Sequence, residues 1–183
     1  MLALAALLLL QARDPDLLLR EDRGISIRKP ARNPDWAFKP NGQIKESQLV
    51  LVHVDGLSIE IYHQDLGRNN VNYDPKLSLE EFWKDLRAEG TYKDTKLVKK
   101  IDYLVLPGRA ASGVRCWYLD MKMTKIEDGS ALEWKRHCFI GHENRSGYFL
   151  DVLGPAGQPE KLKKDVDLIL SSIRTYRIPK DQK

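Results

Sequence analysis

Apolar residues recur along this chain with two periods, one typical of strands and one typical of helices. The clearest alternation is LVLVHVDGLSIEIYHQ (49–64), in which two apolar runs flank Asp55-Gly56, a favoured pair for a tight hairpin turn. A two-residue turn pairs Val54 with Leu57, and every second residue outward from that pair is also apolar on both strands. The pattern therefore predicts a hairpin with one fully apolar face and one mixed face.

Other strands are predicted from shorter apolar runs that end at Pro, Gly or Asn: 25–28, 36–38, 96–106, 114–123, 131–141 and 148–154. Apolar residues at helical spacing predict two helices. In the first, SLEEFWKDLRAE (78–89), we expect Ser78 to cap the N-terminus and Glu81 to complete a capping box. The second covers 159–173, with Pro159 at its first position. The expected inner faces comprise Leu79, Phe82, Trp83 and Leu86 in the first helix, and Leu162, Val166, Ile169, Leu170 and Ile173 in the second.

Antiparallel hairpins, with one helix in mid-chain and one near the end, indicate an α+β fold. We expect a mainly antiparallel sheet covered by helices on its faces, which is an α/β/α sandwich, because the outer positions of the strands are only weakly polar. A length of 183 residues suits a single domain, which we assign to 13–177 and which precedes a polar tail, 178–183.

The chain begins with an uninterrupted apolar run, MLALAALLLL (1–10). This run is far shorter than the roughly 20 residues of a transmembrane helix, and it fits the apolar core of a secretory signal with Ala12 at the cleavage point. No Lys or Arg precedes the run, so the signal is atypical or its true start lies upstream; a hydrophobic helix docked on the domain is the alternative. We expect residues 1–12 to be removed and the mature chain, without a transmembrane helix, to be extracytoplasmic (periplasmic or secreted).

Two stretches carry a resemblance to a known family. GISIRKPARNPDWAF (24–38) has a strand that ends at a Pro and is followed by a Trp, and the last helix runs into LILSSIRTY (168–176). Over about residues 20–177 the order of elements resembles the PsbP-like superfamily, which includes a photosystem accessory protein, a Ran-binding nuclear import factor and exported bacterial proteins. The chain departs from that pattern at Ser172-Ile173, where a Ser-Phe pair is common. The resemblance implies an α/β/α sandwich used mostly for docking onto larger partners.

Both cysteines, Cys116 and Cys138, fall in the long hairpin 114–141. A turn of two or four residues places Cys138 opposite Leu119 and Cys116 on the other face of the sheet. A three-residue loop instead makes the thiols diagonal neighbours on one face, where the separation of roughly 7 Å or more is generally beyond disulfide reach unless a bulge intervenes. Two buried free thiols are the favoured interpretation, and a disulfide between Cys116 and Cys138 stays open.

No pattern of residues indicates catalysis, a cofactor or a metal site. The two cysteines are 22 positions apart in the chain, and His137 points to the face opposite Cys138, whereas zinc ligands come in close pairs. Ser112-Gly113 lacks the nucleophile-elbow glycines, and the acidic pairs are better explained as solvated charges. The net charge of +4 is spread over scattered lysines with acids nearby, which argues against nucleic acid as a partner.

The leading hypothesis from the sequence is an exported, non-enzymatic accessory domain that docks on a protein partner in a larger assembly or in the envelope. The alternatives are a small-molecule or lipid-binding domain, or a hydrolase with an unrecognised site. Trp117 and the alternate residues to Met123 form a Trp/Met stripe that is either core under a helix or an adaptable docking surface. The polar loops 65–77 and 107–113 offer candidate partner contacts at Arg68, Asn69, Asn70, Tyr73 and Arg109, and the alternative, which the sequence favours for each, is unspecialised surface.

Overall fold

The computed structural model describes residues 14–20, 23–39, 47–66, 73–106, 114–141 and 146–176. The first strands are β1 (Leu17–Arg20), β2 (Ile25–Arg28), β3 (Trp36–Lys39), β4 (Ser47–His53) and β5 (Ser58–Asp65). After helix α2 (Pro75–Ala88) come β6 (Tyr92–Leu106), β7 (Val114–Lys125), β8 (Ala131–Ile140) and β9 (Ser146–Pro155). The described chain ends with α3 (Gln158–Lys161), α4 (Lys163–Ser172) and β10 (Arg174–Thr175).

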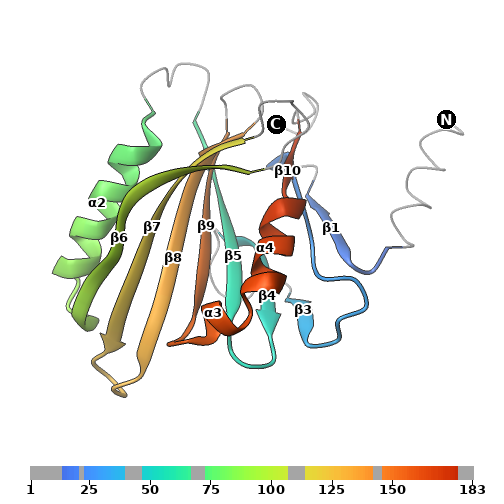
Figure 1. The fold of residues 1–183 in the computed structure, drawn as a ribbon. Coiled ribbons are helices and arrows are strands. Elements are labelled where there is room, and N and C mark those ends of the chain that lie inside the picture. Colours follow the sequence, from blue (N-terminus) through green and yellow to red (C-terminus); the bar gives the residue numbers. More distant parts are fainter. Residues whose placement is uncertain are drawn as a thin grey trace, which may run out of the picture.

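The strands form two antiparallel sheets, which confirms the predicted α+β class. The larger sheet has seven strands in the order β3-β4-β5-β9-β8-β7-β6, and the smaller sheet has the order β1-β2-β10. Helix α2 packs on one face of the large sheet over β6, β7 and β8, while α4 crosses the other face beside the small sheet (Figure 1). The arrangement of the described elements is the expected one of a sheet covered by helices on both faces.

The large sheet separates two hydrophobic clusters. The α2-side cluster is built on Leu79 and Leu86 of α2 and on Leu119, Met121 and Met123 of β7. The stripe of Trp117 and the alternate residues to Met123 is therefore core under a helix, not an open docking surface. The α4-side cluster comprises Ile25, Ile27, Trp36, Leu51, Leu57, Ile59, Ile61, Cys116, Phe139, Tyr148, Leu150, Val152, Val166, Ile169 and Ile173.

The β4–β5 hairpin has a different register from the predicted one. Its turn has three residues rather than two, because the N–H of His53 donates to the carbonyl of Leu57 at 2.8 Å and Gly56 adopts φ +85°. A one-residue slip exchanges the two faces of a strand. Leu51 and Ile59 consequently face each other in the core, whereas Val54, expected in the apolar face, is 72% exposed.

Both predicted helices exist, but the sequence misplaced their ends. Helix α2 begins at Pro75, and its N-cap is Asp74, whose carboxylate accepts from the N–H of Lys76 at 2.8 Å. Ser78 lies inside the helix, so the expected capping box at Ser78 and Glu81 is wrong. The second helix is divided at Leu162 into α3 and α4. Strands β1 and β10 were not predicted, since they are short and pair only with β2.

Two polar contacts fasten the helices to the sheet. On the α4 side, the indole N–H of buried Trp36 donates to Asp165 of α4 at 2.9 Å. On the α2 side, the guanidinium of Arg136 in β8 forms two hydrogen bonds with buried Asp151 of β9 and lies 3.7 Å from the ring centroid of Phe82 in α2. Arg136 and Asp151 form an ion pair, and the Asp165 carboxylate accepts from Trp36 and from Asn33, so each charged group has a polar partner.

Candidate functional site: a polar cleft beside α3 and α4

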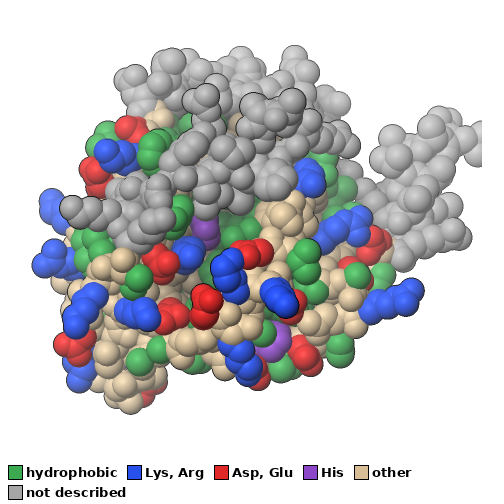
Figure 2. All heavy atoms as spheres, in the orientation of Figure 1, with side chains coloured by type: hydrophobic (Ala, Val, Ile, Leu, Met, Phe, Trp, Pro, Cys, Tyr) green, Lys and Arg blue, Asp and Glu red, His purple; other side chains and the backbone are tan. Residues whose placement is uncertain are grey.

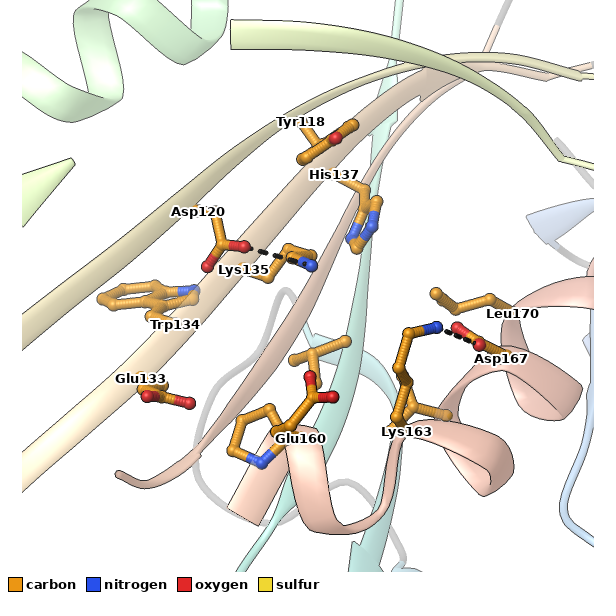
Figure 3. Close-up of a pocket in the computed structure, with 13 residues that line it drawn as sticks. Tyr118, Asp120, Glu133, Trp134, Lys135, His137, Glu160, Lys163, Asp167 and Leu170 are labelled. Carbon is orange, nitrogen blue, oxygen red and sulfur yellow. Dashed lines mark hydrogen bonds and ion pairs between the residues drawn. The ribbon is translucent and has the colours of Figure 1, made fainter. Parts of the chain in front are cut away.

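A cleft of about 220 Å³ lies on the α4 side of the large sheet, between β7 and β8 and the helices α3 and α4 (Figure 3). Alternation along the strands directs Tyr118 and Asp120 of β7, and Lys135 and His137 of β8, to this face. Cross-strand pairing brings Tyr118 opposite His137 and Asp120 opposite Lys135. Helix α4 contributes the facing wall through apolar and charged residues in its first turns.

His137 is the most buried polar residue of this cleft, with 1% of its surface exposed. Its Nδ1 lies 3.3 Å from the carbonyl oxygen of Leu150, and its ring tilts against Tyr118 with the centroids 5.7 Å apart. Burial, followed by the positive charge of Lys135, lowers the pKa of His137 from 6.5 to about 4. The ring is therefore neutral near pH 7. Because a carbonyl only accepts, we assign the proton to Nδ1, which leaves Nε2 with a lone pair.

Charges of both signs surround this histidine. Lys135 pairs with Asp120 at 3.1 Å within the cleft, and Lys163 pairs with Asp167 one helical turn further along α4. Glu133 pairs with Lys122, which lies outside the lining, at 2.7 Å. Figure 2 shows the same mixture of blue and red side chains over the visible face of the molecule. The lining has four carboxylates (Asp120, Glu133, Glu160, Asp167) and two lysines (Lys135, Lys163), and is net negative.

The two cysteines do not contribute to the cleft, and they do not form a disulfide. Cys116 pairs with Phe139 and Cys138 with Trp117, so the thiols lie on opposite faces of the sheet in separate clusters. Both are buried free thiols, which corrects the disulfide alternative. The turn around Gly129 begins one residue earlier than expected, since the N–H of Lys125 donates to the carbonyl of Ser130 at 2.9 Å, so Cys138 faces Trp117 rather than Leu119. The separation of the faces that an even-length turn implies is preserved.

Both thiols are also expected to be unreactive at neutral pH. Burial raises the pKa of Cys116 strongly, and raises that of Cys138 to about 11. The reactive form of a cysteine is the thiolate, so thiols with raised pKa values are poor nucleophiles and poor metal ligands. Cys138 Sγ lies 3.0 Å from the hydroxyl of Tyr73, inside the α2-side cluster.

Tyr73, one of the predicted partner contacts, makes this contact with Cys138 inside the protein. Tyr73 is half-buried, and it packs against the core beneath the start of α2. Desolvation raises the pKa of its hydroxyl strongly. Arg68, Asn69, Asn70 and Arg109, the other proposed contacts, lie outside the described residues, as do the signal-like segment 1–12 and the tail 178–183.

The cleft was not predicted from the sequence. One signal was present, since polar or charged residues alternate through two strands whose other face is core: Tyr118 and Asp120 in β7, and Glu133, Lys135 and His137 in β8. Alternation by itself predicts a solvated face. Only the position of α3 and α4, far away in sequence, turns part of that face into a hollow.

Two general properties of the described residues complete the picture. None of the described helices combines the length and the apolar character needed to cross a membrane. Within the same part of the chain, no three side chains among His, Cys, Asp and Glu come together as a metal site requires.

No protein-family model matches the chain, and no curated protein sequence matches it either. Solved structures do match its fold. The solution structure of cyanobacterial PsbP (CyanoP) from Synechocystis sp. PCC 6803 has a TM-score of 0.60 and 11% identity, and the match covers 87% of this chain and 91% of that one. The crystal structure of LpqN, involved in cell envelope biogenesis of Mycobacterium tuberculosis, also has a TM-score of 0.60, with 13% identity and 84% of each chain covered.

A third match, a crystal structure from Bacteroides thetaiotaomicron, has a TM-score of 0.52 and 10% identity and covers 90% of this chain but 49% of that chain. The chain therefore has a PsbP-like fold, as its order of elements predicted. Identities this low establish the fold alone, because one fold carries many functions.

Proposed function

We propose that this chain is an extracytoplasmic binding domain, without catalytic activity of its own, that docks on a protein partner through the cleft beside α3 and α4. In this proposal residues 1–12 are a signal that is removed, and residues 13–177 form one domain. The observation that carries the proposal is the cleft itself. Its lining combines polar and charged side chains with an apolar wall of Val152, Val166 and Leu170.

The state of the reactive side chains supports binding rather than chemistry. Both thiols are buried and protonated, and His137 is held neutral with a pKa far below that of a general base poised near pH 7. The described lining residues include no Ser, Thr or Cys that His137 could activate as a nucleophile.

The fold supports the same conclusion. CyanoP is the cyanobacterial PsbP, and LpqN is involved in cell envelope biogenesis. An accessory or envelope role for the present chain is consistent with these two structures and with its signal-like first residues. The charged lining of the cleft disfavours a lipid acyl chain, which needs an apolar surface.

The test is recovery of a partner that depends on the cleft. The full chain, tagged at its C-terminus and expressed at near-native level in its source organism, is cross-linked and purified. A charge-swapped variant, Lys163→Asp with Asp167→Lys, keeps net charge and the i,i+4 pair while it alters the cleft wall. The matched control exchanges Lys76→Glu with Glu80→Lys, the equivalent exposed i,i+4 pair on α2.

We expect the same partner with the wild-type chain and with the α2 swap, and much less of it with the α4 swap. Reproducible isolation of the chain alone, or equal capture by both variants, contradicts docking through this cleft. A thermal-shift panel in parallel addresses the alternative, since a rise in melting temperature with a small molecule but no captured protein indicates a small-molecule site.

A further inference from the structure

We propose that Asp128-Gly129, in the exposed turn between β7 and β8, is a site of spontaneous isomerisation to isoaspartate, because the Asp128 carboxyl lies against the peptide whose nitrogen attacks it. This inference goes beyond the proposed function and does not rest on it, so capture of a partner through the cleft has no bearing on it. Three observations carry it: where the carboxyl is held, how open the turn is, and how a second Asp-Gly pair of the chain differs.

The reaction needs no enzyme and no oxidant. The backbone nitrogen of Gly129 forms a bond to the side-chain carboxyl carbon of Asp128 and gives up its proton, while a protonated carboxyl oxygen departs as water. The succinimide ring that results takes up water again at either of its two carbonyls. Opening at one carbonyl restores aspartate. Opening at the other routes the main chain through the side-chain methylene as isoaspartate, without a change of mass.

The carboxyl of Asp128 is held over its own turn. Its Oδ1 accepts from the backbone N–H of Ser130 at 2.9 Å and from the Ser130 hydroxyl at 2.6 Å. A side-chain bond to the backbone two residues on places the carboxyl beside the intervening peptide. The two donors also meet the oxygen on which negative charge develops when the nitrogen attacks, as the donors of an oxyanion hole do. Because both donors reach Oδ1, Oδ2 is the oxygen that takes up a proton and leaves.

The turn gives this rearrangement room. Asp128 and Gly129 are both exposed, and the turn projects from one end of the large sheet (Figure 1). Gly129 adopts φ +73°, and a Cβ placed on it would meet no described atom within 4 Å beyond its chain neighbours. The Gly129 nitrogen, which donates to the carbonyl of Lys125 at 3.0 Å, is therefore not shielded by a side chain of its own residue.

The second Asp-Gly pair, Asp55-Gly56, supplies an internal comparison. It is exposed as well, Gly56 has φ +85°, and the Gly56 N–H donates to a backbone carbonyl at 3.0 Å, so the two attacking nitrogens are engaged alike. The Asp55 carboxylate, however, is tied to α3, because Lys161 Nζ donates to its Oδ2 at 2.8 Å. An ammonium group on this oxygen opposes the protonation that its departure as water requires. Isomerisation should consequently be slower at Asp55 than at Asp128.

The pKa values of the two carboxyls set the conditions of the test. The hydrogen bond from the Ser130 hydroxyl lowers the pKa of Asp128, and the hydrogen bond from Lys161 lowers the pKa of Asp55. Both carboxyls are therefore ionised near pH 7, and the protonated fraction that can lose water grows as the pH falls. Mildly acidic solution, in which the chain is still folded, is where the two rates are best compared.

The test follows isoaspartate in the folded full chain during storage at mildly acidic pH. Peptides that carry Asp55 and Asp128 are separated after proteolysis, and isoaspartate is quantified in each by methyl transfer with an isoaspartyl methyltransferase. We expect the Asp128 peptide to convert about fivefold faster, the factor that corresponds to one exposed ion pair. In urea, where neither turn persists, the two sites should convert at similar rates. Equal rates in the folded chain, or faster conversion at Asp55, overturn the inference.

Variants assign the rates to the contacts described above. Asp128→Glu should abolish the isoaspartate signal of this turn, and the matched control Asp55→Glu should leave the rate at Asp128 unchanged. Lys161→Gln removes the ammonium group from the Asp55 carboxylate, so conversion at Asp55 should rise by up to about fivefold while the rate at Asp128 stays the same. An unchanged rate at Asp55 in this variant contradicts the protection by Lys161, and the inference fails with it.

Discussion

His137 is a titratable side chain that the fold holds almost completely out of water. Strand β8 directs the ring to the α4 side of the sheet, where it lies against Tyr118 and lines the cleft together with residues of α3 and α4. A neutral imidazole with one engaged nitrogen is tolerated there, whereas an imidazolium would carry an uncompensated charge beside Lys135. The stability of the folded chain should therefore depend on the protonation of this one residue.

This dependence has a definite sign. The pKa of His137 is about 4 in the folded chain and about 6.5 when unfolded, so between these values only the unfolded chain binds the proton. The contribution of His137 to the free energy of unfolding should be fully present above pH 6.5. It should fall by up to about 3 kcal/mol as the pH drops towards 4.

Urea unfolding at a series of pH values checks this prediction against His137→Gln, which cannot titrate. The difference in unfolding free energy between the two proteins should decline over the window from 6.5 to 4 and level off below it. A difference that does not change with pH would show that His137 titrates normally in the folded chain. Other acid-sensitive groups are common to both proteins and cancel.

The N-cap of helix α2 lies a few residues before the one expected from the sequence. The start of α2 shows this well, because Asp74 caps the helix and Pro75 occupies its first position. Ser78 resembles a cap in the sequence, yet its hydroxyl bonds to the carbonyl of Asp74 within the first turn, at 3.2 Å. The more N-terminal cap extends the helix by nearly one turn.

Asp74→Ala should lower the free energy of unfolding by about 1 kcal/mol, the usual cost of losing an N-cap. Ser78→Ala is the matched control, and it should cost clearly less because a serine inside a helix contributes no cap and alanine has the higher helix propensity. Urea midpoints, with unchanged slopes, measure both. A larger loss for Ser78→Ala than for Asp74→Ala would restore the cap expected from the sequence.

The whole molecule is organised around one sheet with a separate cluster on each face. Cys116 belongs to the α4-side cluster and Cys138 to the α2-side cluster, so each thiol reports on a different layer. Exposure of Cys138 requires α2 to leave the sheet, whereas exposure of Cys116 requires the other face to open.

Thiol labelling should consequently reveal the order in which the layers open. On the folded chain we expect negligible reaction of either cysteine with a maleimide, two adducts after unfolding in urea, and no change of intact mass with reductant. At intermediate urea, simultaneous labelling indicates one cooperative unit, and earlier labelling of Cys138 indicates that α2 detaches first. Fast labelling of either thiol in the absence of urea contradicts the burial described above.

The sequence predicted the fold better than the site. Alternation in β7 and β8 predicts Cys116 and Cys138 on opposite faces for any turn of even length, but the sequence also allowed a three-residue turn, and only the structure decided between the two. The order of elements was sufficient to indicate the PsbP-like sandwich, which the structural matches confirm. The partner contacts were predicted in loops because loops usually carry function. Tyr73, however, packs against the α2-side cluster.

Periodicity and the chemistry of caps and turns are properties of neighbouring residues, and for this reason the sequence alone determined the kinds of elements, their approximate places and the faces of most strands. The register of β4–β5 depends in addition on burial, since the three-residue turn places Leu51, Leu57 and Ile59 in the α4-side cluster with residues of β9 and α4. The cleft needs α3 and α4 to lie beside β7 and β8. Such contacts join residues that no local pattern connects, so only the tertiary structure could decide them.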